Sequence, residues 1–223
     1  CGFDFDWTLF LMFPVPAAPG FGEAGPPPKR GYLKDAAMSA ASPPPLPERR
    51  ARRRVIDDPQ TAHFITFSCD GRRKLLNQDR RKRIVIHFLE VVRAECEGLC
   101  LGFVIMPEHL HALIRFRERG RLVRFKQEWK RRSSLALLDH FRTTKNPIFE
   151  FLKRPDGSHR VWTPKQYDFN VITRDKALEK LNYMHQNPVK RNLAATPEAW
   201  PFGSARWYAA RKSVGVTMSH IDE

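Results

Sequence analysis

The segment 100–116 constrains the fold of this chain most strongly, because it contains two apolar runs on either side of a short turn. "CLGFVIM" and "HLHALIRF" are both largely apolar, and Pro107 and Glu108 separate them. Apolar runs of this length, bounded by turn residues, predict two antiparallel strands joined as a hairpin. His109 and His111 lie inside the second strand, so the hairpin combines an apolar interior with two titratable side chains.

The other segments predict an α+β fold. Apolar residues at alternating positions predict further strands in the segments 63–69, 160–162 and 167–173. Apolar residues at helical spacing predict helices in the segments 77–98, 121–141 and 174–187. The last helix is expected to end before Pro188, since proline disfavours helical backbone angles at the residue before it. The order β-α-β-β-α-β-α indicates an antiparallel sheet with the helices packed on one of its faces.

The N-terminal part of the chain differs in composition from the rest. Ten of the 18 prolines fall within its first 50 residues, and such a segment buries too little apolar surface to offset the entropy lost on ordering. We therefore expect residues 1–58 to be disordered. We expect residues 1–37 to be upstream translated sequence, because Met38 offers a plausible start. The folded domain is predicted to span residues 59–212, with a flexible tail at 213–223.

The positive charge is concentrated in the predicted domain. The chain has 39 Lys and Arg residues against 24 Asp and Glu residues, a formal net charge of +15, whereas its first 50 residues are balanced. A compact domain with this excess repels itself unless a polyanion is a partner, which favours a nucleic-acid-binding protein over a merely basic one. Four cysteines without a CxxC pair predict reduced thiols in a cytoplasmic protein, and no apolar run is long enough to span a membrane.

The two histidines share one face of their predicted strand, because residues i and i+2 of a strand project to the same side. Leu110 and Ala112 point the other way. His109 and His111 could together chelate a divalent ion. A buried histidine can equally be a core residue with a satisfied hydrogen bond. The spacing leaves both interpretations open, and no HExxH motif completes a zinc site.

The last predicted helix brings a tyrosine and a carboxamide together. Its apolar stripe is formed by Ala177, Leu178, Leu181 and Met184. Tyr183 and Asn187 fall on the opposite side, one helical turn apart, with Lys180 on the same edge. Helix geometry alone favours an exposed tyrosine on a solvated face, which needs no functional explanation.

Four segments together resemble one known family. They are "HFITFSCDGRRKLL", "VIMPEHLHALI", "WTPKQYDFNVITRDKALEKLNYMHQNPVKRNLA" and "WPFGSARWYA". The pairing of "MPEHLH" with "YMHQNPVK" about seventy residues later is the most specific part. The chain resembles the single-tyrosine HUH transposases, specifically the REP-associated tyrosine transposase branch, over roughly residues 60–210.

The resemblance implies a ferredoxin-like or RRM-like antiparallel sheet and a complete active site. His109 and His111 would be the metal motif, Asn187 a third ligand, and the ion Mg²⁺ or Mn²⁺. Tyr183 would be the nucleophile that nicks and rejoins single-stranded DNA near hairpins through a 5′-phosphotyrosine. The expected partner is single-stranded or hairpin DNA, bound by a monomer or a homodimer in the nucleoid-associated part of the cytoplasm.

Basic residues near these elements are candidates for holding the DNA backbone, namely Arg124, Lys126, Lys130, Arg131, Lys180, Lys190 and Arg191. Trp129 and Trp162 are candidates for stacking on bases, although Trp129 also belongs to the expected buried stripe of its helix and is better explained as a core residue. Tyr167 is a second candidate nucleophile, ranked below Tyr183 because no carboxamide follows it one helical turn later. Glu108 departs from the branch, which often has asparagine there, and adds a negative charge beside the expected metal.

Two other interpretations are considered. The first is a non-catalytic hairpin-DNA-binding protein descended from such a transposase, and the joint presence of Tyr183, His109, His111 and Asn187 argues against it. The second is a metal-dependent hydrolase unrelated to DNA, and the positive charge argues against that one.

Overall fold

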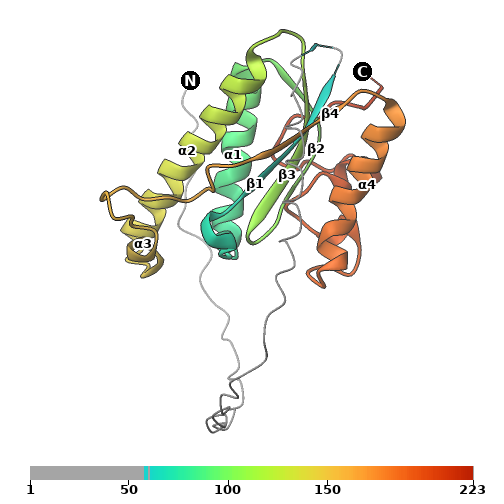
Figure 1. Cartoon of the computed structure of the whole chain (residues 1–223). Coiled ribbons are helices and arrows are strands. Elements are labelled where there is room, and N and C mark those ends of the chain that lie inside the picture. Colours follow the sequence, from blue (N-terminus) through green and yellow to red (C-terminus); the bar gives the residue numbers. More distant parts are fainter. Residues whose placement is uncertain (1–57, 60, 223) are drawn as a thin grey trace, which may run out of the picture. The chain divides into compact units, whose positions relative to one another are not determined.

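The computed structural model describes residues 58–59 and 61–222, so the disorder predicted for residues 1–57 lies outside the described residues. Its centre is a four-stranded antiparallel sheet with the strand order β2-β3-β1-β4 (Figure 1). The strands are β1 (Ala62–Ser68), β2 (Gly98–Ile105), β3 (His109–Phe116) and β4 (Tyr167–Val171). The helices are α1 (Asp79–Glu95), α2 (Arg121–Thr143), α3 (Ile148–Phe151), α4 (Arg174–Lys190) and α5 (Ala205–Ala210), with single 3-10 turns at η1 (Asp70–Arg72) and η2 (Pro197–Ala199). The predicted α+β class with an antiparallel sheet is confirmed.

The predicted hairpin forms around Pro107 and Glu108. Ile105 pairs with Leu110 across β2 and β3, and the Met106 amide donates to the His109 carbonyl oxygen at 2.8 Å. Both strands are buried on both of their faces. The sheet therefore needs a cover on each side.

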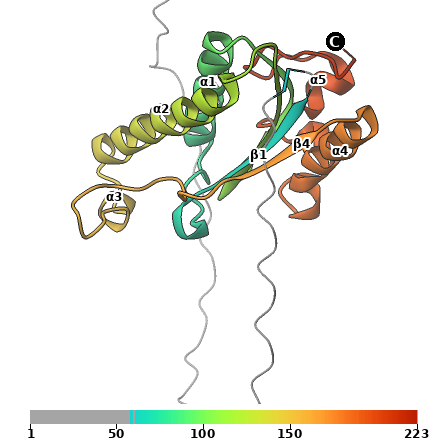
Figure 2. The same ribbon diagram turned by 45° about the horizontal axis from the view of Figure 1, so that its top comes forward.

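The helices cover both faces of the sheet, whereas the sequence predicted one covered face (Figures 1 and 2). On one side, the Trp129 ring of α2 lies 5.1 Å from the Phe67 ring of β1, and its indole nitrogen donates to the Val85 carbonyl of α1. On the other side, α4 lies against β2. The prediction was wrong because strands that are apolar on both faces need two covering layers. We call the two sides the α2 face and the α4 face.

The close approach of α4 to the sheet depends on a glycine in β2. A Cβ atom at Gly102 would lie 2.5 Å from Leu181 Cδ1 and 2.9 Å from Met184 Cε. Only a residue without a side chain leaves room for these two buried side chains of α4. Gly102 therefore sets the distance between α4 and the strands that carry the histidines.

Two predicted boundaries need correction. The last helix continues through Pro188 to Lys190, because Asn187 and Pro188 are both buried and only two helical residues follow the proline. The interruption of hydrogen bonding by proline is thus confined to the last turn. The segment 160–162 forms an isolated bridge between Trp162 and Cys69 and no strand.

The predicted flexible tail is anchored to the domain. Val214 and Val216 are buried, and the Ser219 amide donates to the Cys100 carbonyl oxygen of β2 at 2.9 Å. Thr217 donates to the Glu90 carboxylate through its amide at 2.9 Å and its hydroxyl at 2.8 Å. This segment covers part of β2, whose edge would otherwise present unpaired backbone groups. Among the described helices, none is long and apolar enough to cross a membrane.

Candidate active site on the α4 face

The histidine pair lies on the α4 face, where strand alternation places it. The His109 and His111 rings are buried, with centroids 4.8 Å apart and planes inclined by 75°. Thr66 of β1 pairs with His111 across the sheet. The pair is therefore held by two strands of the sheet and covered by α4.

Each histidine has its Nδ1 atom occupied by a neighbouring side chain. Thr66 Oγ1 lies 2.8 Å from His111 Nδ1, and Glu108 Oε1 lies 3.0 Å from His109 Nδ1. Because a carboxylate only accepts hydrogen bonds, His109 carries its proton on Nδ1 and presents a lone pair at Nε2. His111 Nε2 is buried and has no hydrogen-bond partner among the described residues. His111 Nε2 is thus open to a ligand, whereas His109 Nε2 lies 3.3 Å from the Asn187 side-chain nitrogen.

The environment keeps both imidazoles neutral. Burial lowers the pKa of His111 to about 3, helped by the positive charges that His109, Arg72 and Lys180 can carry. Burial also lowers the pKa of His109, although Glu108 opposes that shift. Neutral imidazole is the form that binds metal ions.

A buried carboxylate connects the hairpin turn to the end of α4. Glu108 Oε1 accepts from Arg191 Nη1 as well as lying beside His109 Nδ1. Burial opposes ionisation of Glu108, but the hydrogen bond from Arg191 and the charge of His109 outweigh it and lower the pKa of this carboxyl. The glutamate therefore orients His109 while Arg191 balances its charge.

The helix α4 places Tyr183 and Asn187 beside the histidines. The Tyr183 ring lies 5.4 Å from the His111 ring, and the tyrosine side chain is 46% exposed. Asn187 Nδ2 lies 3.3 Å from His109 Nε2. Helix geometry predicted both residues on the solvent side, but Asn187 is buried because this side of α4 faces the histidines. Leu178, predicted in the apolar stripe, is exposed instead.

The donor set fits a divalent ion held by two nitrogens and one oxygen. No group of three or more His, Cys, Asp or Glu residues in the described part of the chain could hold a metal. Asn187 places a carboxamide beside the histidines, and a half-turn of its amide would point Oδ1 at them. The buried, unpaired Nε2 of His111 is the observation that supports this fit.

The predicted DNA-binding residues divide between the two faces. Lys180 and Lys190 lie on α4 and Arg191 caps its C-terminal end, and this helix covers the face of the sheet that carries the histidines. Four others lie on α2, on the opposite side of the sheet, namely Arg124, Lys126, Lys130 and Arg131. Lys126 is buried, and its Nζ donates to Asp168 Oδ2 at 2.5 Å. This lysine is a core residue, contrary to the prediction of a DNA contact, because its stem packs with the apolar stripe of α2.

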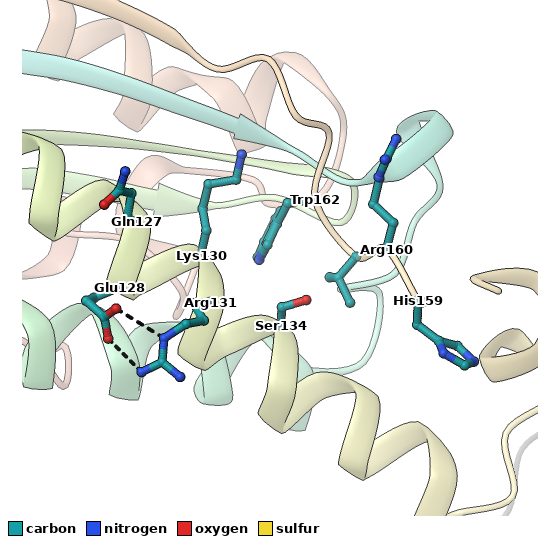
Figure 3. Close-up of a pocket in the computed structure, with 9 residues that line it drawn as sticks. Gln127, Glu128, Lys130, Arg131, Ser134, His159, Arg160 and Trp162 are labelled. Atoms are coloured by element: carbon teal, nitrogen blue, oxygen red, sulfur yellow. Dashed lines mark hydrogen bonds and ion pairs between the residues drawn. The ribbon is translucent and has the colours of Figure 1, made fainter. Parts of the chain in front are cut away.

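A basic groove lies on the α2 face, away from the histidines (Figure 3). It has a volume of about 470 Å³ and is lined mainly by α2 and the segment 159–162. Lys130 and Arg160 contribute positive charge, and Arg131 is paired with Glu128 at 2.7 Å. Trp162 is buried in its floor and donates to Ser133 Oγ at 3.1 Å, while Trp129 is fully buried. The two predicted stacking tryptophans therefore present no ring face to a base.

Sequence reasoning missed two residues that complete the site. Thr66 holds His111, and Phe64 stacks on the same ring with centroids 5.2 Å apart and planes inclined by 20°. Both belong to the alternating positions of β1, which the sequence did predict as a strand. The pairing register of β1 with β3, which brings them to the histidines, is not encoded in either strand alone.

The chain combines an antiparallel sheet, a strand with paired histidines and a tyrosine on the covering helix, and the comparisons with known proteins find similarity to transposases. Residues 59–152, which include both histidines, match the family model described as IS200-like transposases. Tyr183 and Asn187 lie outside the matched segment. The predicted resemblance to the tyrosine transposases is confirmed.

Two solved structures are similar to the chain. One is described as a REP-associated tyrosine transposase bound to a REP hairpin, with 17% identity and a TM-score of 0.51 over 78% of this chain and 94% of the other. This likeness supports the fold. A second, a crystal structure from Deinococcus radiodurans, has 16% identity over 62% of this chain and 97% of the other, and its TM-score of 0.40 is too low to carry an argument. No curated protein matches the chain.

Proposed function

We propose that this protein is a metal-dependent tyrosine transposase that nicks and rejoins single-stranded DNA near hairpins through a 5′-phosphotyrosine. The observation that carries the proposal is the convergence of two imidazoles and one carboxamide beside the half-exposed phenol of Tyr183. His111 Nε2 is unpaired among the described residues, and His109 Nε2 lies 3.3 Å from Asn187 Nδ2. The two histidines lie in the segment that matches the IS200-like transposase family, and α4 brings Tyr183 and Asn187 to them.

The neutral His109 and His111, with Asn187, would hold Mg²⁺ or Mn²⁺, leaving its other positions to water and phosphate oxygens. When bound, the ion would polarise the scissile phosphate and neutralise charge that develops on it. Thr66 and Glu108 keep the imidazoles in the orientation that presents Nε2.

The phenol of Tyr183 supplies the nucleophile. The phenol releases its proton to water as its oxygen forms a bond to phosphorus, the bond from phosphorus to the 3′ oxygen breaks, and the 3′ oxygen takes up a proton from water and leaves as a hydroxyl. Lys180 lies one turn earlier on α4, with Nζ 5.6 Å from the Phe64 ring centroid, so a cation lies close to the phenol. Attack of a 3′ hydroxyl on the phosphotyrosine reverses these steps, so rejoining requires no nucleotide triphosphate.

Single-stranded or hairpin DNA is the proposed substrate. The net charge of +15 favours a polyanion, and a protein of similar fold is described as bound to a REP hairpin. We propose that the protein acts as a monomer or a homodimer in the nucleoid-associated cytoplasm.

The test is incubation with Mn²⁺ and hairpin oligonucleotides that carry randomised single-stranded flanks, followed by denaturing electrophoresis. We expect a covalent adduct with the wild type and with Tyr167→Phe, and none with Tyr183→Phe, which should still bind the DNA. An adduct with Tyr183→Phe would show that the nucleophile is another residue. DNA binding by the wild type without any nick or adduct would identify a non-catalytic hairpin-binding protein instead.

A further inference from the structure

A row of side chains connects the histidines to the far edge strand of the sheet. Thr66 of β1 pairs with His111 of β3 on one side and with Tyr167 of β4 on the other. Directly paired residues of neighbouring strands project to the same face of a sheet. Tyr167 therefore projects to the α4 face, two strand spacings, or roughly 10 Å, from His111.

The next row of the sheet continues this aromatic surface. Phe64 pairs with Phe169 of β4, and Lys180 Nζ lies 5.6 Å from the Phe64 ring centroid and 5.3 Å from that of Phe169. The Phe64 ring also lies 6.2 Å from the Tyr183 ring. Aromatic rings thus extend from the proposed nucleophile to β4, with one ammonium group above them.

At the outer end of this surface, Tyr167 is 49% exposed. We define Tyr167, Phe169 and Lys180 as the β4 ledge. An accessible aromatic ring beside a cation is the combination that binds single-stranded nucleic acid without sequence preference, since every base has a π face and every nucleotide a phosphate.

We propose that the β4 ledge is a stacking subsite for a base of the single strand that flanks the scissile phosphate, with Tyr167 as the ring on which the base stacks. The inference rests on the proposed function, and it gives Tyr167 a role other than nucleophile. The groove on the α2 face does not qualify, because it offers positive charge while its tryptophan is buried and hydrogen-bonded (Figure 3). Lys180 serves both sites, since it belongs to the β4 ledge and lies one helical turn before Tyr183 on α4.

The test compares the full chain's affinity for oligothymidylate and for an abasic oligonucleotide of the same length, by fluorescence anisotropy in EDTA. Both probes carry the same phosphates, so only the bases differ. We expect the wild type to prefer oligothymidylate. Tyr167→Ala should weaken oligothymidylate binding by about five- to a hundredfold while leaving abasic binding unchanged. Tyr167→Phe should keep the preference. Phe151→Ala is the matched control, because Phe151 is 71% exposed on α3 and far from the ledge in sequence.

Several results would contradict the proposal that the β4 ledge binds a base. One is an unchanged preference in Tyr167→Ala, and another is an equal loss in Tyr167→Phe, which would implicate the hydroxyl instead of the ring. A third is an equal loss in Phe151→Ala. If the wild type nicks hairpin DNA but shows no base preference, the stacking role of the β4 ledge is rejected and the proposed function is retained. If it neither nicks hairpin DNA nor binds either probe, both fail.

Discussion

The two faces of the same sheet use buried polar groups in opposite ways. On the α4 face, His111 Nε2 and Glu108 Oε2 are buried without hydrogen-bond partners among the described residues. On the α2 face, Asp168 lies between two other polar side chains, with Lys126 Nζ at 2.5 Å from one oxygen and His63 Nδ1 at 3.6 Å from the other. Both faces therefore contain buried polar atoms without a hydrogen-bond partner, but on the α2 face those of His63 and Asp168 lie 3.6 Å from each other as an ion pair, whereas on the α4 face His111 Nε2 has no such neighbour among the described residues.

The difference follows from strand alternation. In β3 the histidines project to the α4 face, while Leu110 and Ala112 project to the α2 face. Unpaired buried polar atoms destabilise a fold. His111 Nε2 differs from other such atoms because a second histidine and a half-exposed phenol lie beside it. We therefore assign the chemistry to the α4 face and mainly stability to the α2 face, and variants of each face test this division.

The largest effect is expected for His111→Ala. Loss of a proposed metal ligand should reduce the Mn²⁺-dependent nicking rate by more than about a hundredfold, because even residues that only orient ligands cost 10–100-fold. The free energy of unfolding without metal should fall by only about 1–2 kcal/mol. Nicking assays and urea denaturation measure the two quantities.

His140→Gln is the matched control for that variant. His140 lies on α2, and its Nε2 is also buried without a partner in the described part of the chain. Its substitution should leave nicking unchanged. Equal loss of nicking in both variants would break the assignment of chemistry to the α4 face.

The complementary variant on the α2 face is Lys126→Met. Removing the ammonium leaves the buried Asp168 carboxylate without its closest partner, which should lower the free energy of unfolding by about 3–5 kcal/mol. Lys126→Met combined with Asp168→Asn should recover part of that loss, because no unpaired charge remains. The folded fraction should nick DNA at the wild-type rate. Normal stability with weakened DNA binding would instead support the DNA contact that the sequence predicted for this lysine.

Much of the fold could be predicted from local patterns. The β2–β3 hairpin, the strand β1 and the helices α1, α2 and α4 each follow from a periodicity of apolar residues that lies within the segment itself. The distribution of helices between faces could not, because it depends on which side of the sheet each helix crosses. Likewise, the anchoring of residues 213–222 depends on contacts with β2 and α1, which are more than 100 residues away in sequence.

The candidate site also contains residues that the sequence predicts and residues that only the tertiary structure reveals. His109, His111, Tyr183 and Asn187 could be selected from spacing and resemblance, and the structure brings all four together. Composition predicted the positive charge but not the side on which each cation lies, so Lys126 was misassigned. The partners of the histidines on β1 and at the end of α4 depend on strand register and helix docking, which no single segment encodes.

Glu108→Gln tests whether a residue that orients a proposed metal ligand matters on the α4 face. The amide can no longer offer His109 Nδ1 a full negative charge, so Mn²⁺ affinity should fall by about 10–100-fold. Glu128→Gln is the control, since Glu128 is an arginine-paired carboxylate on the α2 face. Calorimetric titration with Mn²⁺ should show no change for the control. Unchanged affinity in Glu108→Gln would mean that this glutamate only secures the end of α4 through Arg191.

The smallest effect is a difference in the pH dependence of stability. The folded pKa of His111 is about 3, below its ordinary 6.5, so unfolding takes up a proton between these values and stability falls as the pH decreases from 6.5. This group contributes at most about 1.4 kcal/mol per pH unit, and His109 shifts in the same direction. Asp168 is held ionised by His63 and Lys126 despite its burial, so its pKa is lowered from 3.8 and its contribution is lost only below that value.

Urea denaturation without metal from pH 7 to 4 should therefore give a shallower slope for His111→Gln and an unchanged slope for Asp168→Asn, although the latter is less stable throughout. Because metal ions bind the neutral imidazoles, adding Mn²⁺ should steepen the wild-type slope and leave that of His111→Gln unaffected. A steeper slope in wild type that Mn²⁺ does not change would show that His111 is a buried core histidine, and the α4 face would then lose the feature that distinguishes it from the α2 face.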